Sequence, residues 1–145
     1  MPNKYLEKIA EGISLQSMDI PIEMLQKADK DKYLDGYVLN GDTRKDRLGI
    51  LHNNKIIGFL TPRLGSGKAL DAWRTGTIYI SEQHRGKGYG KQAIKEFFKD
   101  KPKGVAFVDP DNTPSRRSFE GSGFTLSKML HKSNGEEYLV YRKGF

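Results

Sequence analysis

The chain contains no cysteine among its 145 residues. This absence excludes disulfide bonds, thiolate nucleophiles and cysteine-based zinc sites. The histidines, His52, His84 and His131, are also few, and they lie far apart in the sequence. Because none of them stands at metal-ligand spacing from another, we expect no metal site.

Long apolar runs are missing as well. No stretch approaches the roughly 18 residues that a membrane-spanning helix requires. Residues 1–12, MPNKYLEKIAEG, lack the apolar core of a signal peptide. No low-complexity segment or internal repeat interrupts the chain. We therefore expect a cytoplasmic protein without a membrane partner, folded as a single domain over residues 1–145.

Acidic residues are too few to balance the basic ones, and the formal net charge is +7. Most of the excess of Lys and Arg lies in residues 81–145. Such a balance is compatible with a solvated basic surface, with a polyanionic ligand or with nucleic acid. The basic residues are spread along the chain rather than interleaved with aromatic residues, which disfavours nucleic acid.

The apolar pattern and the turn residues predict an α/β protein in which strands and helices alternate. Ala93, Ile94, Phe97 and Phe98 form the apolar stripe of a helix that Pro102 terminates. We expect strands at 13–19, 47–52, 56–61, 77–81, 104–109, 124–132 and 137–143, helices at 21–34, after Gly90 and from Pro114, and a loop at 64–76.

Three glycines in five positions stand between an expected strand and an expected helix, in SEQHRGKGYGKQAIKEFF, residues 81–98. Glycine permits positive φ and keeps Cβ atoms away from a ligand. A loop at a helix N-terminus directs successive backbone N–H groups at an anion. The segment therefore predicts an anion-binding loop. Its residues are Gly86, Gly88 and Gly90, with Arg85, Lys87 and Lys91 around them.

Two other phosphate-binding patterns fail. The segment GSGKAL, residues 65–70, resembles part of a nucleotide P-loop. That motif needs a glycine where Pro62 stands and a Ser or Thr where Ala69 stands. The dinucleotide-binding pattern would place its third glycine at the position of Lys91. Neither nucleotide site is predicted.

Two segments together resemble the GNAT superfamily of N-acyltransferases. RGKGYG, residues 85–90, is similar to the acyl-CoA-binding motif Q/R-x-x-G-x-G/A, and NTPSRRSFEGSGF, residues 112–124, is similar to the later segment N-x-x-S/A-x-x-x-Y-E-x-x-G-F. The first motif also matches from Gln83, but the frame from Arg85 suits a helix that begins after Gly90. The resemblance implies a GNAT-like fold, a central, mixed and mostly antiparallel twisted sheet of about six to seven strands flanked by about four helices.

The resemblance also implies a reaction. Family members transfer an acetyl group from acetyl-CoA, used as co-substrate without a metal, to a primary amine by direct attack in a ternary complex. The acceptor is a small molecule or a protein, and it docks on N-terminal helices and on loops such as 62–76, where Asp71 and Trp73 could meet a cation. Whether the chain forms a homodimer is left open.

The family's acyl-CoA contacts transfer to matching positions. Backbone N–H groups of residues 86–91 would bind the pyrophosphate, and the N–H of Ile80 would hold the thioester carbonyl as charge develops on its oxygen. The pantetheine arm would lie between strands 77–81 and 104–109, with Asn112 bonded to it; Arg116 or Arg117 would meet the 3′-phosphate. The implied set is Ile80, Arg85, Gly86, Lys87, Gly88, Tyr89, Gly90, Lys91, Asn112, Ser115, Arg116 and Phe119.

Two departures concern proton transfer. Many family members carry a glutamate base on the strand before the loop, where this chain has Ile78 and Ile80. Glu82 is the nearest carboxylate and our first candidate for the base, followed by Tyr79 and then by Asp109 and His84.

The second departure is Phe119, which stands where the family usually has the tyrosine that protonates the thiolate. Phenylalanine keeps the packing and removes the acid. An alternative therefore stays open, a GNAT-fold protein that binds a macromolecular partner, either protein or nucleic acid, with little or no catalysis.

Overall fold

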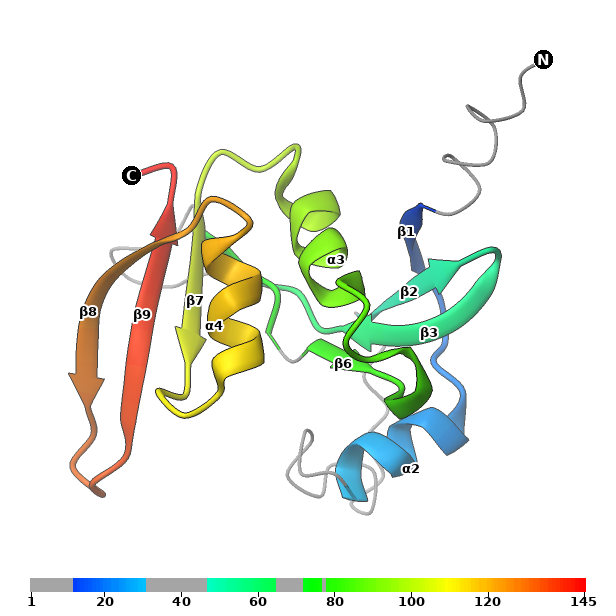
Figure 1. Ribbon diagram of the computed structural model, residues 1–145, viewed down its shortest axis with the longest axis horizontal. Coiled ribbons are helices and arrows are strands. Elements are labelled where there is room, and N and C mark those ends of the chain that lie inside the picture. Colours follow the sequence, from blue (N-terminus) through cyan, green and yellow to red (C-terminus); the bar gives the residue numbers. More distant parts are fainter. Residues whose placement is uncertain (1–11, 31–46, 65–71, 77) are drawn as a thin grey trace. The chain divides into compact units, whose positions relative to one another are not determined.

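The computed structural model describes residues 12–30, 47–64, 72–76 and 78–145 (Figure 1). Within these ranges the chain forms three α-helices, one 3-10 helix and nine strands, which confirms the predicted mixed α/β class. The chain divides into two compact units. The first unit comprises Met1–Pro62 and Thr77–Tyr89, and the second comprises Arg63–Gly76 and Gly90–Phe145. None of the described helices is both long enough and apolar enough to cross a bilayer.

The first unit contains a four-stranded antiparallel sheet in the order β1-β2-β3-β6. The turn between β2 and β3 places Asn53 and Asn54 at φ 52° and 62°, the left-handed pair that a tight hairpin requires. The predicted hairpin is therefore confirmed. The strands are β1 (Ile13–Ser17), β2 (Leu48–His52), β3 (Lys55–Leu60) and β6 (Ile78–Ile80).

Helix α2 (Ile22–Lys30) supplies the core of this unit. Leu25 and Ala28, three residues apart, share one face and pack with Phe59 and Tyr79. The carbonyl of Pro21 accepts the backbone N–H groups of residues 24 and 25, so the helix begins one residue later than predicted. The predicted continuation over 31–34 lies outside the described residues.

Gly58 allows β3 and β6 to approach each other closely. It pairs with Ile80, and a Cβ atom at position 58 would collide with the carbonyl oxygen of Tyr79. A side chain at this position would therefore push β6 away from the sheet.

The second unit contains a five-stranded mixed sheet in the order β4-β5-β7-β9-β8. Trp73 of β5 pairs with Gly104 of β7 in the parallel sense, and the other neighbours are antiparallel. The loop predicted over 64–76 therefore contains strand residues. The strands are β4 (Arg63–Leu64), β5 (Trp73–Arg74), β7 (Gly104–Val108), β8 (Thr125–His131) and β9 (Glu137–Lys143).

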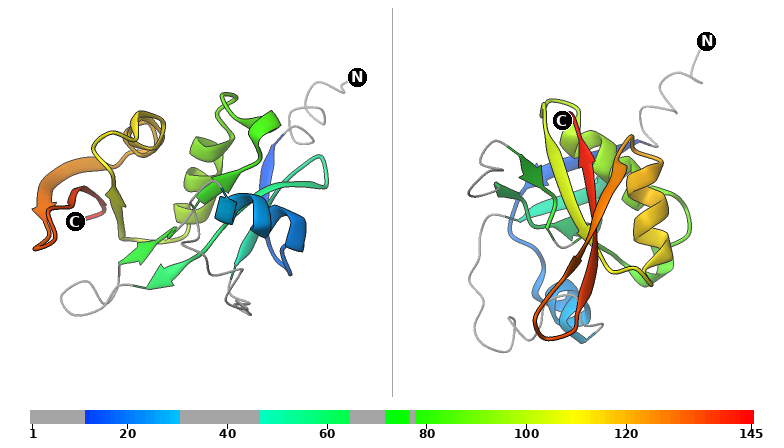
Figure 2. Two further views of the ribbon diagram at one scale, coloured as in Figure 1. Left: turned by 90° about the horizontal axis from the view of Figure 1, so that it is seen from below. Right: turned by 90° about the vertical axis from the view of Figure 1, so that its left-hand side faces the viewer.

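Helix α4 (Thr113–Glu120) lies against the face of β7 and β9, as Figure 2 shows. Phe119 is its buried residue, and Phe124 and Tyr141 contact the Phe119 ring from the segments that follow. Helix α3 (Tyr89–Phe98) buries the predicted stripe of residues 93, 94, 97 and 98. It begins two residues earlier than predicted, because Tyr89 and Gly90 are already helical.

Candidate functional site: a glycine loop at the start of helix α3

The chain leaves β6 through a short 3-10 helix (Glu82–His84) and enters the glycine loop. Gly86 and Gly88 adopt φ values of 76° and 81°, which L side chains rarely tolerate. In the described part of the chain, no heavy atom lies within 4 Å of a Cβ built at either position. Backbone conformation, rather than crowding by the protein, is what requires glycine here.

Gly90 differs from the other two glycines. It lies inside α3 without a positive φ, and a Cβ atom there would be 3.9 Å from Ser118 Oγ, an ordinary contact. The expectation that the third glycine serves the conformation of the turn is therefore wrong, because of these three glycines only Gly86 and Gly88 have positive φ.

Helix α3 follows the loop directly, so its first-turn N–H groups have no carbonyl one turn earlier to bind. These donors and the helix dipole favour an anion at this end of the helix. Lys87 and Lys91 are exposed beside them and add positive charge. The arrangement fits a phosphate or pyrophosphate group.

Arg85 connects the loop to β6. Its Nε donates a hydrogen bond to the carbonyl oxygen of Ile80 at 2.7 Å, and its guanidinium lies 5.3 Å from the centre of the Tyr79 ring. One end of the glycine loop is thus held against the strand that precedes it.

The backbone N–H of Ile80 points away from β3. Ser81 donates its N–H to the carbonyl of Ile57 at 2.8 Å, which makes Ile57 and Ser81 a hydrogen-bonded pair of the antiparallel ladder. Such pairs alternate with pairs whose N–H and C=O groups face outward. Ile80, opposite Gly58, is in an outward-facing pair, and β6 is at one edge of its sheet. The N–H of Ile80 is therefore directed beyond that edge, as an oxyanion donor must be.

The candidate bases occupy different surroundings. The Tyr79 side chain is 1% exposed, and its ring lies 5.6 Å from that of Phe59 in the core of the first unit. Glu82 is exposed on the 3-10 helix. The packing of Tyr79 identifies it as a core residue, whereas the base role of Glu82 stays a prediction.

Asn112 is the N-cap of α4. Its Oδ1 accepts the backbone N–H of Ser115 at 3.2 Å, and Pro114 stands in the first turn. The helix expected from Pro114 is present and begins one residue earlier, at Thr113. Because capping uses the amide oxygen, the amide nitrogen of the exposed Asn112 side chain is the group suited to donate to a pantetheine carbonyl. That contact stays a prediction.

Arg116 has partners that the sequence did not reveal. Its Nε donates to the Tyr141 hydroxyl at 3.3 Å and its Nη1 to the carbonyl of Pro110 at 3.3 Å. The Tyr141 hydroxyl in turn donates to Glu120 Oε1 at 2.7 Å. Arg117 is exposed on the same helix and has no such contact among those described, which favours it over Arg116 for the predicted 3′-phosphate role.

Phe119 is 3% exposed. Its ring centre lies 5.1 Å from that of Phe124, edge-on, and 6.5 Å from that of Tyr141, nearly parallel. The residue that replaces the family's tyrosine is therefore part of the aromatic core of the second unit.

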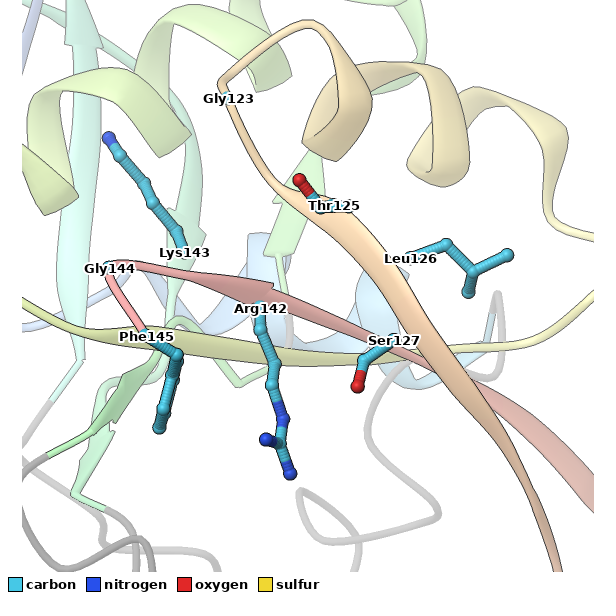
Figure 3. Close-up of a pocket in the computed structure, with 8 residues that line it drawn as sticks. All are labelled: Gly123, Thr125, Leu126, Ser127, Arg142, Lys143, Gly144 and Phe145. Carbon is cyan, nitrogen blue, oxygen red and sulfur yellow. The ribbon is translucent and has the colours of Figure 1, made fainter.

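A cavity of about 380 Å³ opens at the ends of β8 and β9 (Figure 3). Its lining includes Thr125, Ser127, Arg142 and Phe145, and the Arg142 guanidinium lies 5.0 Å from the centre of the Phe145 ring. None of the predicted site residues lines it. No cluster of potential metal ligands occurs among the residues that the structure describes.

Known structures share this fold. The GNAT-family acetyltransferase of Bacillus anthracis has a TM-score of 0.72 at 17% identity, over 92% of this chain and 95% of its own. The aminoglycoside acetyltransferase AAC(6')-Ib, solved with ribostamycin and coenzyme A, has a TM-score of 0.70 at 15% identity, over 91% and 93%. The microcin C7 self-immunity acetyltransferase MccE, solved with acetyl-CoA and AMP, has a TM-score of 0.66 at 16% identity, over 92% of each chain.

Sequence comparisons add a family assignment. No curated protein matches the chain. The model of the acetyltransferase (GNAT) family matches residues 14–124, which include both motif segments. This match spans most of the chain, and the chain therefore belongs to the GNAT family of acetyltransferases.

Proposed function

We propose that this chain is an N-acetyltransferase that moves an acetyl group from acetyl-CoA to a primary amine. The observation that carries the proposal is the outward N–H of Ile80, five residues before the loop that begins at Arg85. Structural neighbours were solved with coenzyme A or acetyl-CoA, which supports the same co-substrate here.

The loop binds the pyrophosphate through backbone N–H groups, and Lys87 and Lys91 add charge. The Ile80 N–H donates to the thioester carbonyl oxygen. When the amine nitrogen attacks the carbonyl carbon, negative charge grows on that oxygen, and the fixed donor stabilises it. The C–S bond then breaks, the sulfur leaves as thiolate, and the amine loses one proton. The products are the N-acetyl amine and free coenzyme A.

Proton removal is the demanding step. An alkylamine with a pKa near 10.4 is rarely the free base at pH 7, which adds roughly 4–5 kcal/mol to the barrier unless the site accepts the proton. Strand β6 carries isoleucine at both positions where a family glutamate could stand. Glu82 is the proposed base, acting directly or through water. The leaving thiol, with a pKa near 8.5 by analogy with cysteine, needs less assistance.

The acceptor class is a small molecule or a protein. The shared fold accommodates both, since neighbours were solved with an aminoglycoside and, in the NatC complex, with a Gag peptide. We also propose that the reaction proceeds in a ternary complex, because the chain has no cysteine to carry the acetyl group as a thioester.

A second candidate is a GNAT-fold protein that binds coenzyme A and a macromolecule without turnover. The observation that favours it is Phe119, which is buried among aromatic rings where an acid would stand.

Two experiments test both candidates. In the first, the chain is incubated with labelled acetyl-CoA and a panel of amines, peptides and proteins. In the second, coenzyme A binding is measured by calorimetric titration. Transfer to any acceptor supports the enzyme. Coenzyme A binding without transfer across the panel supports the binding protein. A chain that does not bind coenzyme A contradicts both.

A further inference from the structure

Two histidines flank the aromatic ring of Tyr89 at the start of α3. The ring centres of His52 and Tyr89 are 4.8 Å apart with their planes tilted by 37°. The His84 ring lies on the 3-10 helix, 6.4 Å from Tyr89 and tilted by 49°. All three side chains are partly buried, and all three belong to the first unit.

These contacts hold the far end of the glycine loop. Glycines have no side chain with which to hold the loop, and Lys87 is exposed. Arg85 anchors one end on Ile80 and Tyr79, as described above. Tyr89 is the side chain that anchors the other end, immediately after Gly88.

His52 is well placed as an anchor because β2 is an internal strand, paired with β1 on one side and β3 on the other. His84 contacts the same ring from the segment before the loop. Its Nδ1 is buried and has no hydrogen-bond partner among the described residues. Packing against Tyr89 is therefore the interaction that the structure shows for the His84 ring.

A loop that contains two positive-φ glycines has many conformations, and ordering it opposes ligand binding. Anchors at both ends remove part of that cost before the ligand arrives. We propose that His52, which lies outside the glycine motif, is a positioning residue for the pyrophosphate of coenzyme A and acts by holding Tyr89. This inference rests on the proposed function, because it assigns a role only if the loop binds that ligand.

A double-mutant cycle tests the proposal with coenzyme A as the titrant. His52→Ala should weaken binding about tenfold, in the range that lost preorganisation produces. His52→Phe, which keeps a ring against Tyr89, should restore affinity to within about twofold of wild type. In a Tyr89→Ala background, His52→Ala should have no further effect, because the residue through which it acts is gone.

The matched control is His131→Ala, which removes an exposed histidine of β8 in the second unit and should leave affinity unchanged. His52→Leu replaces the alanine variant if alanine lowers the melting temperature so far that the chain unfolds.

Wild-type affinity in His52→Ala, or an equal loss in both Tyr89 backgrounds, overturns the positioning role while the proposed function stands. Absence of coenzyme A binding by the wild-type chain overturns the proposed function itself. The two failures are therefore distinguished by the wild-type titration alone.

Discussion

The hydroxyl of Tyr141 on β9 donates a hydrogen bond of 2.7 Å to Glu120 Oε1 on α4. The Tyr141 hydroxyl oxygen itself accepts the Nε–H of Arg116, from the preceding turn of the helix. Because the Tyr141 residue is 0% exposed and its ring packs beneath Phe119, one side chain joins the aromatic core to the outer polar face of α4. This contact connects β9 to the helix that Asn112 caps.

Replacing Tyr141 by phenylalanine keeps the ring and removes both hydrogen bonds. We expect the free energy of unfolding to fall by about 1 kcal/mol, the usual net value of such bonds when the partners can still reach water. Urea denaturation measures the change, and Tyr138→Phe in the same strand, whose hydroxyl bonds the exposed Glu136, is the matched control. Equal stability of wild type and Tyr141→Phe would show that these two hydrogen bonds do not stabilise the fold.

The pH dependence of the same pair of proteins gives a second expectation. Burial, the largest cause, raises the pKa of Tyr141 above its ordinary value of 10.0. Below that value both the folded and the unfolded chain hold the proton, so the contribution to stability is complete. Above it the unfolded chain loses the proton first, and stability falls. The stability difference between wild type and Tyr141→Phe should therefore narrow as pH rises beyond 10.0.

Gly88→Glu should abolish coenzyme A binding by placing a side chain and a negative charge in the loop. The φ of 81° should also cost about 1–2 kcal/mol of stability. Gly135→Glu is the matched control, since Gly135 has a φ of 90° in a hairpin turn and equally open surroundings. Both variants should lose similar stability in denaturation experiments, and only Gly88→Glu should lose binding in calorimetry. Unchanged affinity in folded Gly88→Glu contradicts the assignment of the loop.

Ile80→Pro removes the proposed oxyanion donor and no ladder hydrogen bond, because the N–H of residue 80 faces away from β3. Edge positions of this kind tolerate proline. We expect acetyl transfer to fall about 10²–10³-fold, the effect of losing one oxyanion donor, with coenzyme A affinity largely kept. Ile80→Val retains the N–H and should retain the rate. A proline variant as fast as the valine variant would show that the donor lies elsewhere.

Phe119→Tyr introduces the family's phenol. The thiolate can leave without an acid, so we expect measurable transfer in wild type and an equal or greater rate, up to about tenfold, in the variant. Position 119 is 3% exposed, so the added hydroxyl would be buried and could lower the stability of the fold. The melting temperature of each protein is therefore measured together with its rate. Failure of both proteins to transfer acetyl across a broad panel, with coenzyme A still bound, favours the binding protein.

Local patterns predicted the elements whose signals lie within a few residues. The helix expected from Pro114 is such a case, because a first-turn proline is a local signal, whereas the capping of this helix by Asn112 was not predicted. The glycine pattern places the start of α3 after Gly90, two residues too late, because a helix accepts glycine at modest cost.

Other features depend on partners that are distant in the sequence. Strands β4 and β5 have two residues each, too few to show alternation, and they form because partner strands bind them. The pair Arg116–Tyr141 joins positions 25 residues apart. The direction of the Ile80 N–H depends on the register between β3 and β6, which no periodicity within β6 reveals.

The collision that a side chain at Gly58 would cause with Tyr79 has a consequence for mutational scanning. Position 80 contributes a backbone atom, so a saturation library selected for acetyl transfer should tolerate many side chains there and reject proline. Selection should instead restrict position 58, which pairs with Ile80 from β3. Even alanine there would displace β6 and move the Ile80 N–H with it. A position highly sensitive to selection would then be a glycine on the neighbouring strand, one that contributes no atom to the reaction.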